Sequence, residues 1–279
     1  MRVRLTPDKG LRVEKARLNG VPMLILRPAD REPAKIGLMW IHGGGYITGM
    51  KEMVFMGRAL DLVVNHGCTV VAPDYRLSVL HPWPAGLEDC YGALLYMRKH
   101  ADELNMRSDQ LMVGGESAGG GLCAALCMLA RDRRSVQIAA QMPLYPMLDD
   151  RDTESSYNNH NKIWNTRRNH QAWQIYLRGK RNREHLPVYA VPGRQTDYHD
   201  LPPAYTFVCT GEPFYDETMF YVNNLRRAGV IAEINVYPGM YHAFDMVEPE
   251  HPMSQEAIRD FNTWFAYARA TYFRAQEEQ

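Results

Sequence analysis

Residues 111–130, LMVGGESAGGGLCAALCMLA, decide the fold more than any other stretch of the chain. Five glycines fall within the eight residues GGESAGGG, between an apolar run at 111–115 that is typical of a strand and a run at 118–132 that is typical of a helix. At the junction, residues 115–119 read G-E-S-A-G, the pattern of a sharp strand-to-helix turn that exposes a serine hydroxyl. Small neighbours are needed there because strand and helix approach closely. The stretch therefore predicts a strand, a strained turn carrying Ser117, and a helix.

Short strand-like runs alternate with longer helix-like runs along the rest of the chain. Several of the strand-like runs are apolar throughout, which is typical of strands covered on both faces. The alternation predicts one α/β domain over residues 1–279, with a mostly parallel central sheet and helices on both of its faces. The predicted strands are 21–28, 36–42, 69–75, 111–115, 138–145, 205–210 and 232–237, and the predicted helices are 52–65, 86–104, 118–132, 214–228 and 254–274.

Residues 149–200 interrupt this alternation. They are polar, rich in Asn, Arg and His, and contain one credible helix at about 166–178. An insertion between two strands of such a sheet commonly lies over the carboxyl ends of the strands, so we expect a small lid over a functional site. A solvated surface excursion is the alternative. Four apolar or aromatic residues of the segment favour packing over solvation: Trp164, Trp173, Tyr176 and Leu177.

Composition excludes several classes of function. The 32 Lys and Arg residues balance the 32 Asp and Glu residues, so nucleic acid, an anionic membrane surface or a polyanionic substrate is not favoured. No run of about 18 apolar residues and no leader-like start is present, and we expect a cytoplasmic protein. The five cysteines are expected to be reduced and buried, because they lie mostly in apolar segments without CxxC spacing.

A second glycine cluster, His42-Gly43-Gly44-Gly45, directly follows the apolar run at 36–42. Backbone N–H groups of such a loop can approach an oxyanion because glycine leaves the backbone uncovered. A phosphate-binding loop is excluded, since no G-K-[ST] follows and the spacing is not G-x-G-x-x-G.

His242 follows the last predicted strand, where a hydrolase of this kind needs its histidine. It is the only histidine between residues 199 and 251. Metal-binding spacings such as HExxH are absent, so neither a metal nor any other cofactor is expected.

Several ordered motifs resemble the hormone-sensitive-lipase-like branch of the α/β-hydrolases, which includes bacterial acetyl esterases and other short-chain carboxylesterases. They are HGGGY (42–46), DYRLSVLHPWPAGLEDC (74–90), GGESAGGG (114–121), LPPAYTFVCTGEPFYDET (201–218) and GMYHAF (239–244). The resemblance extends from about residue 20 to the C-terminus. It implies Ser117 as the nucleophile, His242 as the general base, and N–H groups of Gly43, Gly44 and Ala118 as oxyanion donors. Relatives often form homodimers through the edge near the last strand.

The acid of the triad departs from the family pattern. Where relatives have D-P-L-x-D-E, this chain has residues 212–217, EPFYDE, so the resemblance assigns the role to Glu212. Asp216 is the rival, although a carboxylate at a helix start is favoured there by the helix dipole alone. Nearby motif residues are expected to be structural: Asp74 and Arg76 as an ion pair, and Glu116 as a hydrogen-bonding neighbour of the nucleophile.

These parts predict a serine carboxylesterase that hydrolyses small acetyl to butyryl esters through an acyl-enzyme. An amidase or peptidase with the same triad is one alternative, because the same acid can protonate an oxygen or a nitrogen leaving group. A non-catalytic ligand-binding relative is the other, and such a protein is expected to lack a triad member.

Overall fold

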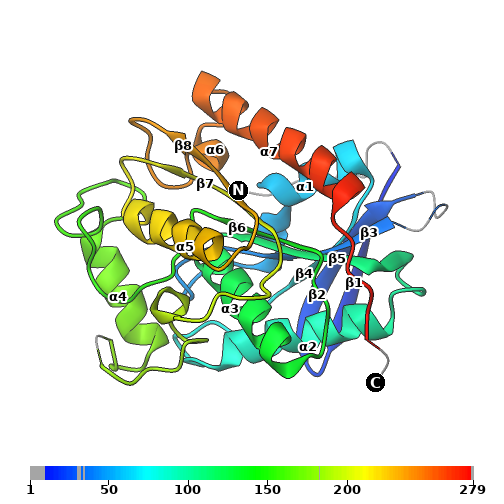
Figure 1. The fold of residues 1–279 in the computed structure, drawn as a ribbon, viewed down its shortest axis with the longest axis horizontal. Helices are drawn as coiled ribbons and strands as arrows, with labels where there is room; N and C mark the ends of the chain where they lie inside the picture. Colours follow the sequence, from blue (N-terminus) through cyan, green and yellow to red (C-terminus); the bar gives the residue numbers. More distant parts are fainter. Residues whose placement is uncertain (1–9, 30–32, 34, 182, 278–279) are drawn as a thin grey trace.

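An eight-stranded sheet forms the centre of the computed structural model, which describes residues 10–29, 33, 35–181 and 183–277 (Figure 1). The strand order is β1-β2-β4-β3-β5-β6-β7-β8. β2 pairs antiparallel with both β1 and β4, and every other pairing is parallel. The mostly parallel sheet is therefore confirmed. The strands are β1 (Leu11–Leu18), β2 (Val21–Pro28), β3 (Lys35–Ile41), β4 (Thr69–Pro73), β5 (Met106–Glu116), β6 (Ala140–Leu144), β7 (Ala204–Cys209) and β8 (Ala232–Tyr237).

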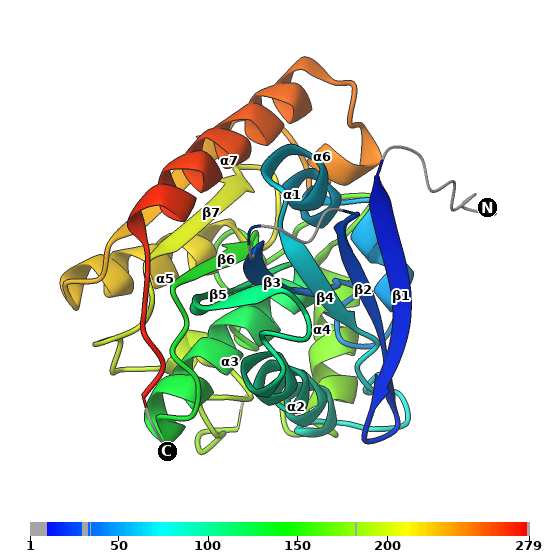
Figure 2. The same cartoon turned by 90° about the vertical axis from the view of Figure 1, so that its right-hand side faces the viewer.

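Helices cover both faces of this sheet. In the view of Figure 2, α1 (Arg58–His66) and α7 (Pro252–Thr271) lie above it, and α2 (Ala85–Lys99) and α3 (Ala118–Arg133) lie below. Strand β3 shows why: Leu38 and Trp40 pack with the α1 and α7 side, whereas Met39 and Ile41 pack with the α2 and α3 side. Alternate residues of a strand point to opposite faces, so a strand covered on both sides must be apolar throughout. The remaining helical elements are η1 (Lys51–Phe55), α4 (Thr166–Tyr176), η2 (Pro192–Arg194), α5 (Tyr215–Arg227) and α6 (Phe244–Val247).

Three expectations differ from the structure. Strand β1 was not predicted, because it is an edge strand with exposed positions and four charged residues in LRVEKARL. The helix expected over 52–65 is two elements, η1 and α1, separated at Gly57, whose extended backbone interrupts the helix. The expected Asp74–Arg76 ion pair is wrong, since Asp74 pairs with the Lys51 ammonium at 2.9 Å and Arg76 pairs with Asp89 of α2 at 2.8 Å.

All five cysteines are buried free thiols. In the described part of the chain, no helix combines the length and the apolar character that a bilayer crossing requires.

Candidate active site

Ser117 occupies the turn between β5 and α3. Its backbone has φ 59° and ψ −120°, a conformation that residues with a side chain rarely adopt. Three main-chain bonds of 3.0 Å hold it: its N–H donates to the Leu144 carbonyl, and its own carbonyl accepts from the N–H groups of Gly121 and Met147. A Cβ on Gly119 would lie 2.0 Å from the Ile41 carbonyl oxygen, so only glycine allows α3 to approach β3 this closely. The glycines of this stretch therefore permit the turn that raises Ser117 above the sheet.

His242 lies against Ser117 from the loop after β8. The distance from His242 Nε2 to Ser117 Oγ is 2.9 Å, and His242 Nδ1 is hydrogen-bonded to the Glu212 carboxylate in the turn after β7. All three side chains are buried, with exposed fractions of 5% or less. The second Glu212 oxygen accepts the Cys209 N–H at 3.2 Å, which fixes the carboxylate against the strand end. The structure thus brings together Ser117, Glu212 and His242, which follow the carboxyl ends of β5, β7 and β8.

Asp216 is engaged elsewhere. Its carboxylate accepts the Ser155 N–H at 2.7 Å, and its own N–H donates to the Ser155 hydroxyl at 3.1 Å. This pair ties the first turn of α5 to the segment that follows β6. Glu212, and not Asp216, is the carboxylate bonded to His242.

Three aromatic rings surround the imidazole of His242. Tyr145 and Phe214 present their edges to it at centroid distances of 5.1 and 5.0 Å, and the Trp164 indole lies at 6.4 Å. Tyr145 also donates its hydroxyl to the buried Asp245 at 3.0 Å. None of these residues was assigned a definite part in the site from the sequence, although Phe214 lies in the motif at 212–217 and Trp164 is one of the aromatic residues of 149–200.

The glycine loop approaches Ser117, but one of its N–H groups is already used. Gly43 donates its N–H to Glu116 Oε1 at 2.9 Å. Gly43 was expected to donate to the oxyanion, but its N–H is already hydrogen-bonded to a buried carboxylate. Within the described residues, neither Gly44 nor Gly45 donates its N–H to another group. Ala118 is the first residue of α3, where a backbone N–H has no partner in its own helix.

Comparison with known proteins identifies the family of the chain. Residues 38–246 match the model of a family described as the alpha/beta hydrolase fold. The chain belongs to this family.

Several relatives of this α/β-hydrolase are named as esterases. Carboxylesterase NlhH of Mycobacterium tuberculosis is 32% identical over 247 residues, covering 81% of this chain and 72% of NlhH. Esterase LipI of the same species is 29% identical over 208 residues, and this match spans 74% of the chain and only 65% of LipI. Among solved structures, a bacterial heroin esterase has a TM-score of 0.86 and 32% identity, with 92% of this chain and 84% of that chain covered.

The segment 149–200 of this α/β-hydrolase packs on the glycine loop. A Cβ on Gly45 would lie 2.3 Å from Cη2 of Trp164, so the indole rests directly on the Gly45 backbone. Helix α4 (Thr166–Tyr176) confirms the predicted helix, and its Trp173 and Tyr176 are buried. The Tyr176 ring stacks on Tyr46 of the loop at 4.0 Å. The expected packing against an apolar surface is therefore found.

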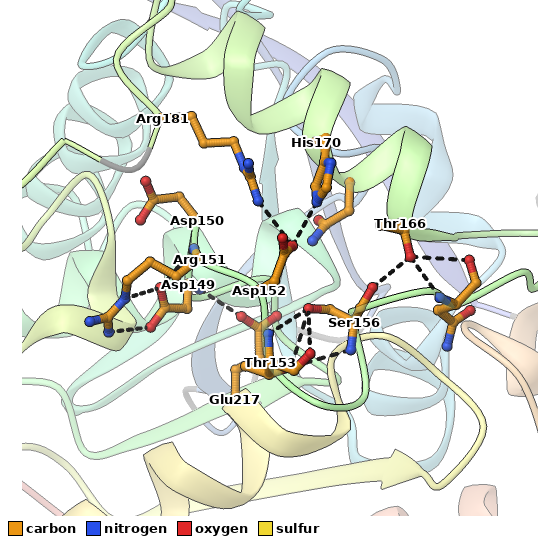
Figure 3. Close-up of polar contacts among 12 residues, drawn as sticks. Asp149, Asp150, Arg151, Asp152, Thr153, Ser156, Thr166, His170, Arg181 and Glu217 are labelled. Atoms are coloured by element: carbon orange, nitrogen blue, oxygen red, sulfur yellow. Dashed lines mark hydrogen bonds and ion pairs between the residues drawn. The ribbon is translucent and has the colours of Figure 1, made fainter.

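Polar contacts hold the start of this segment, as Figure 3 shows. The Asp149 N–H donates to Glu217 of α5 at 2.7 Å. The Asp152 carboxylate lies between His170 of α4, at 2.6 Å, and Arg181, at 3.0 Å. Helix α4 and the residues after it are thus linked to the chain that leaves β6.

Among the residues that the structure describes, no group of three or more His, Cys, Asp or Glu side chains is arranged to hold a metal ion.

Proposed function

We propose that this protein is a serine carboxylesterase that hydrolyses short-chain acyl esters, acetyl to butyryl, through an acyl-enzyme. The observation that carries the proposal is the hydrogen-bonded series Ser117–His242–Glu212, in which the His242 Nε2 to Ser117 Oγ distance is 2.9 Å. The names of its relatives support the same chemistry, among them an acetyl esterase of Salmonella typhi that is 27% identical over 234 residues, covering 82% of this chain.

The proposed reaction has two halves. Ser117 Oγ attacks the ester carbonyl carbon while His242 Nε2 accepts the hydroxyl proton, and the resulting imidazolium then donates that proton to the departing alcohol. Water repeats these steps on the acyl-enzyme and releases the carboxylic acid. Glu212 holds the His242 ring through Nδ1 and stabilises its charged form.

The oxyanion of each tetrahedral intermediate needs N–H donors on the side opposite His242. We assign Gly44 and Ala118 from the expected set and add Gly45 in place of Gly43, because the Gly43 N–H is bonded to Glu116. Gly44 and Gly45 have φ values of 112° and 61°, which turn the loop backbone in a way that side chains would resist. Donors fixed before the reaction stabilise developing charge without reorganisation.

We further propose that residues 149–200 form a cap and that Trp164 limits the acyl group. Its indole lies on Gly45 and beside His242, so an acyl chain bound between the loop and the cap meets this ring. We expect acetyl to butyryl groups to bind beneath the ring and longer acyl chains to be hindered by it.

A panel of p-nitrophenyl esters from acetyl to decanoyl, with matching anilides, tests the function. We expect turnover of the acetyl to butyryl esters, little turnover of the anilides, and a loss of about 10⁴-fold or more in Ser117→Ala. Faster anilide than ester hydrolysis would establish the amidase alternative. Retention of a tenth of the wild-type rate by Ser117→Ala would refute the nucleophile assignment.

A further inference from the structure

We propose that Glu116 is a positioning residue, which in its carboxylate form holds the glycine loop where Gly44 and Gly45 can bind the oxyanion. This inference rests on the proposed ester hydrolysis. It concerns a side chain with no part in the proton transfers of Ser117 and His242 or in the hydrogen bond between His242 and Glu212.

Glu116 lies under the glycine loop and is 3% exposed. Each of its carboxylate oxygens receives one N–H group: Oε1 accepts from Gly43 at 2.9 Å and Oε2 accepts from the Trp40 indole at 2.6 Å. Both donors come from β3 or the loop that directly follows it. An ionised carboxylate can accept from both, whereas a carboxylic acid or an amide carries hydrogen on one of its two polar atoms. The ionised form accepts both N–H groups in charge-assisted hydrogen bonds, whereas the acid offers one of them only its weaker hydroxyl oxygen.

The hydrogen bond between Gly43 and Glu116 matters because the glycine loop and the turn that carries Ser117 are in contact here. A Cβ on Gly43 would lie 3.0 Å from the Glu116 carbonyl oxygen and 3.2 Å from Ser117 Cβ. Gly44 is the next residue, so a shift of Gly43 moves the N–H groups proposed to bind the oxyanion. Such donors act within a narrow range, about 2.7–3.1 Å from the oxygen. Loss of the Glu116 bond should therefore reduce turnover more than substrate binding.

The ionisation of Glu116 is opposed by its surroundings. The pKa of its carboxyl is raised to about 7, mainly because the group is buried; the nearby Asp245 adds to this increase, and the hydrogen bonds from Gly43 and Trp40 limit it. The other groups in electrostatic contact with it are Tyr75 after β4 and Tyr145 after β6; both are buried, which raises their pKa, so they remain neutral at physiological pH. Within the described residues, no Lys or Arg forms an ion pair with Glu116.

The basic side chains near Glu116 interact with other groups. Arg58 of α1 pairs with Asp245 at 3.3 Å and with Asp61 at 2.7 Å. His42 of the loop is buried, which lowers its pKa and favours the neutral imidazole. Because an acid with a raised pKa holds its proton up to that pH, the carboxylate that fixes the loop forms only as the pH rises through about 7. Turnover should therefore fall as the pH is lowered through this range.

The kinetic test compares Glu116→Gln, Trp40→Phe and the double variant with p-nitrophenyl acetate as substrate. In Glu116→Gln the amide N–H₂ faces either the Gly43 N–H or the Trp40 indole N–H, so one of these donors loses its acceptor. We expect kcat to fall about 10²-fold with KM little changed. Trp40→Phe removes one of those donors, so in the double variant the oxygen of the introduced amide can accept from Gly43, and at least tenfold of the loss should return. Melting temperatures of the three variants serve as the folding control. Wild-type kcat in Glu116→Gln, or a loss that Trp40→Phe does not restore, overturns the proposal.

A second measurement does not depend on activity. The indole N–H resonance of Trp40, assigned by its absence in Trp40→Phe, should shift with a midpoint near pH 7 in the wild type and equally in Ser117→Ala. It should not shift in Glu116→Gln. A Trp40 resonance that stays constant across about two pH units on either side of that midpoint refutes the ionisation of Glu116 in this range. Absence of Ser117-dependent hydrolysis with a normal Trp40 titration would instead refute the esterase assignment.

Discussion

Trp164→Ala should extend the acyl range of the enzyme. The Trp164 indole rests on Gly45 and lies 6.4 Å from the His242 ring, so it is the cap side chain in contact with both the glycine loop and the proposed base. Alanine removes the whole ring and leaves the loop backbone unchanged. Longer acyl groups can then occupy the space that the indole fills.

The size of the effect follows from the burial of methylene groups. Each buried methylene contributes about 0.8 kcal/mol, a factor of about 4 in kcat/KM. Octanoyl has four methylenes more than butyryl, which gives an upper limit of about 3 kcal/mol, or about 200-fold, for the gain relative to butyryl. Trp164 is half-buried, so we expect the substitution to cost about 2 kcal/mol of folding stability, less than a fully buried tryptophan would.

The assay is kcat/KM for p-nitrophenyl esters from acetyl to decanoyl, measured for wild type, Trp164→Ala and Trp164→Phe. The phenylalanine variant is the matched control: it keeps an aromatic ring over Gly45 and loses the Nε1 bond to Asn169 at 3.3 Å. It should keep the wild-type preference for short chains. An unchanged ratio of octanoyl to butyryl activity in Trp164→Ala would refute the role of this ring, and a wild-type optimum at octanoyl or longer would refute the short-chain proposal itself.

Two further predictions concern the triad acid and the absence of cofactors. Glu212→Gln should lower kcat by about 10⁴-fold with near-normal KM, because the amide cannot stabilise the His242 imidazolium. Asp216→Asn should leave kcat within about threefold and lower the melting temperature, because a neutral amide oxygen accepts the Ser155 N–H, bonded at 2.7 Å, more weakly than a carboxylate does. Steady-state kinetics and thermal unfolding of both variants check this, and the reverse pattern would transfer the role to Asp216. Activity should also survive EDTA and dithiothreitol, since the described residues include no metal-binding group and the cysteines are free; activity lost to EDTA and restored by zinc would contradict this.

The features predicted most accurately from the sequence are those that backbone packing requires. Glycines at 115 and 119 are required because a Cβ on either would lie within 2.5 Å of the Ile41 carbonyl oxygen. The same close approach of strand and helix therefore explains both the G-x-S-x-G pattern and the shape of the turn. Apolar strands covered on both faces were predicted for the same reason. β1 was missed because its solvent-facing positions give it the composition of a surface segment.

Side-chain partners were harder to predict than elements. Gly43 shares its local sequence pattern with Gly44, and only the position of the Glu116 carboxylate shows that its N–H is occupied. Asp74 and Arg76 are close in sequence, yet partners from η1 and α2 are better placed in space. Residue type and spacing restrict which groups can interact, but the choice among several partners depends on how the elements pack.

The site depends on residues 149–200 as well as on the ends of the core strands. Among the contacts of this segment with the site, Trp164 lies on Gly45, the Ser155 N–H donates to Asp216, and the Asn159 side chain donates to the Gly211 carbonyl at 3.2 Å. Gly211 directly precedes Glu212, so the last two contacts hold both ends of the turn that carries the carboxylate bonded to His242. A flexible side chain such as glutamate needs a fixed backbone if its carboxylate is to orient an imidazole. We therefore infer that the segment acts on the proposed reaction by bracing the Glu212 turn as well as by covering the acyl group.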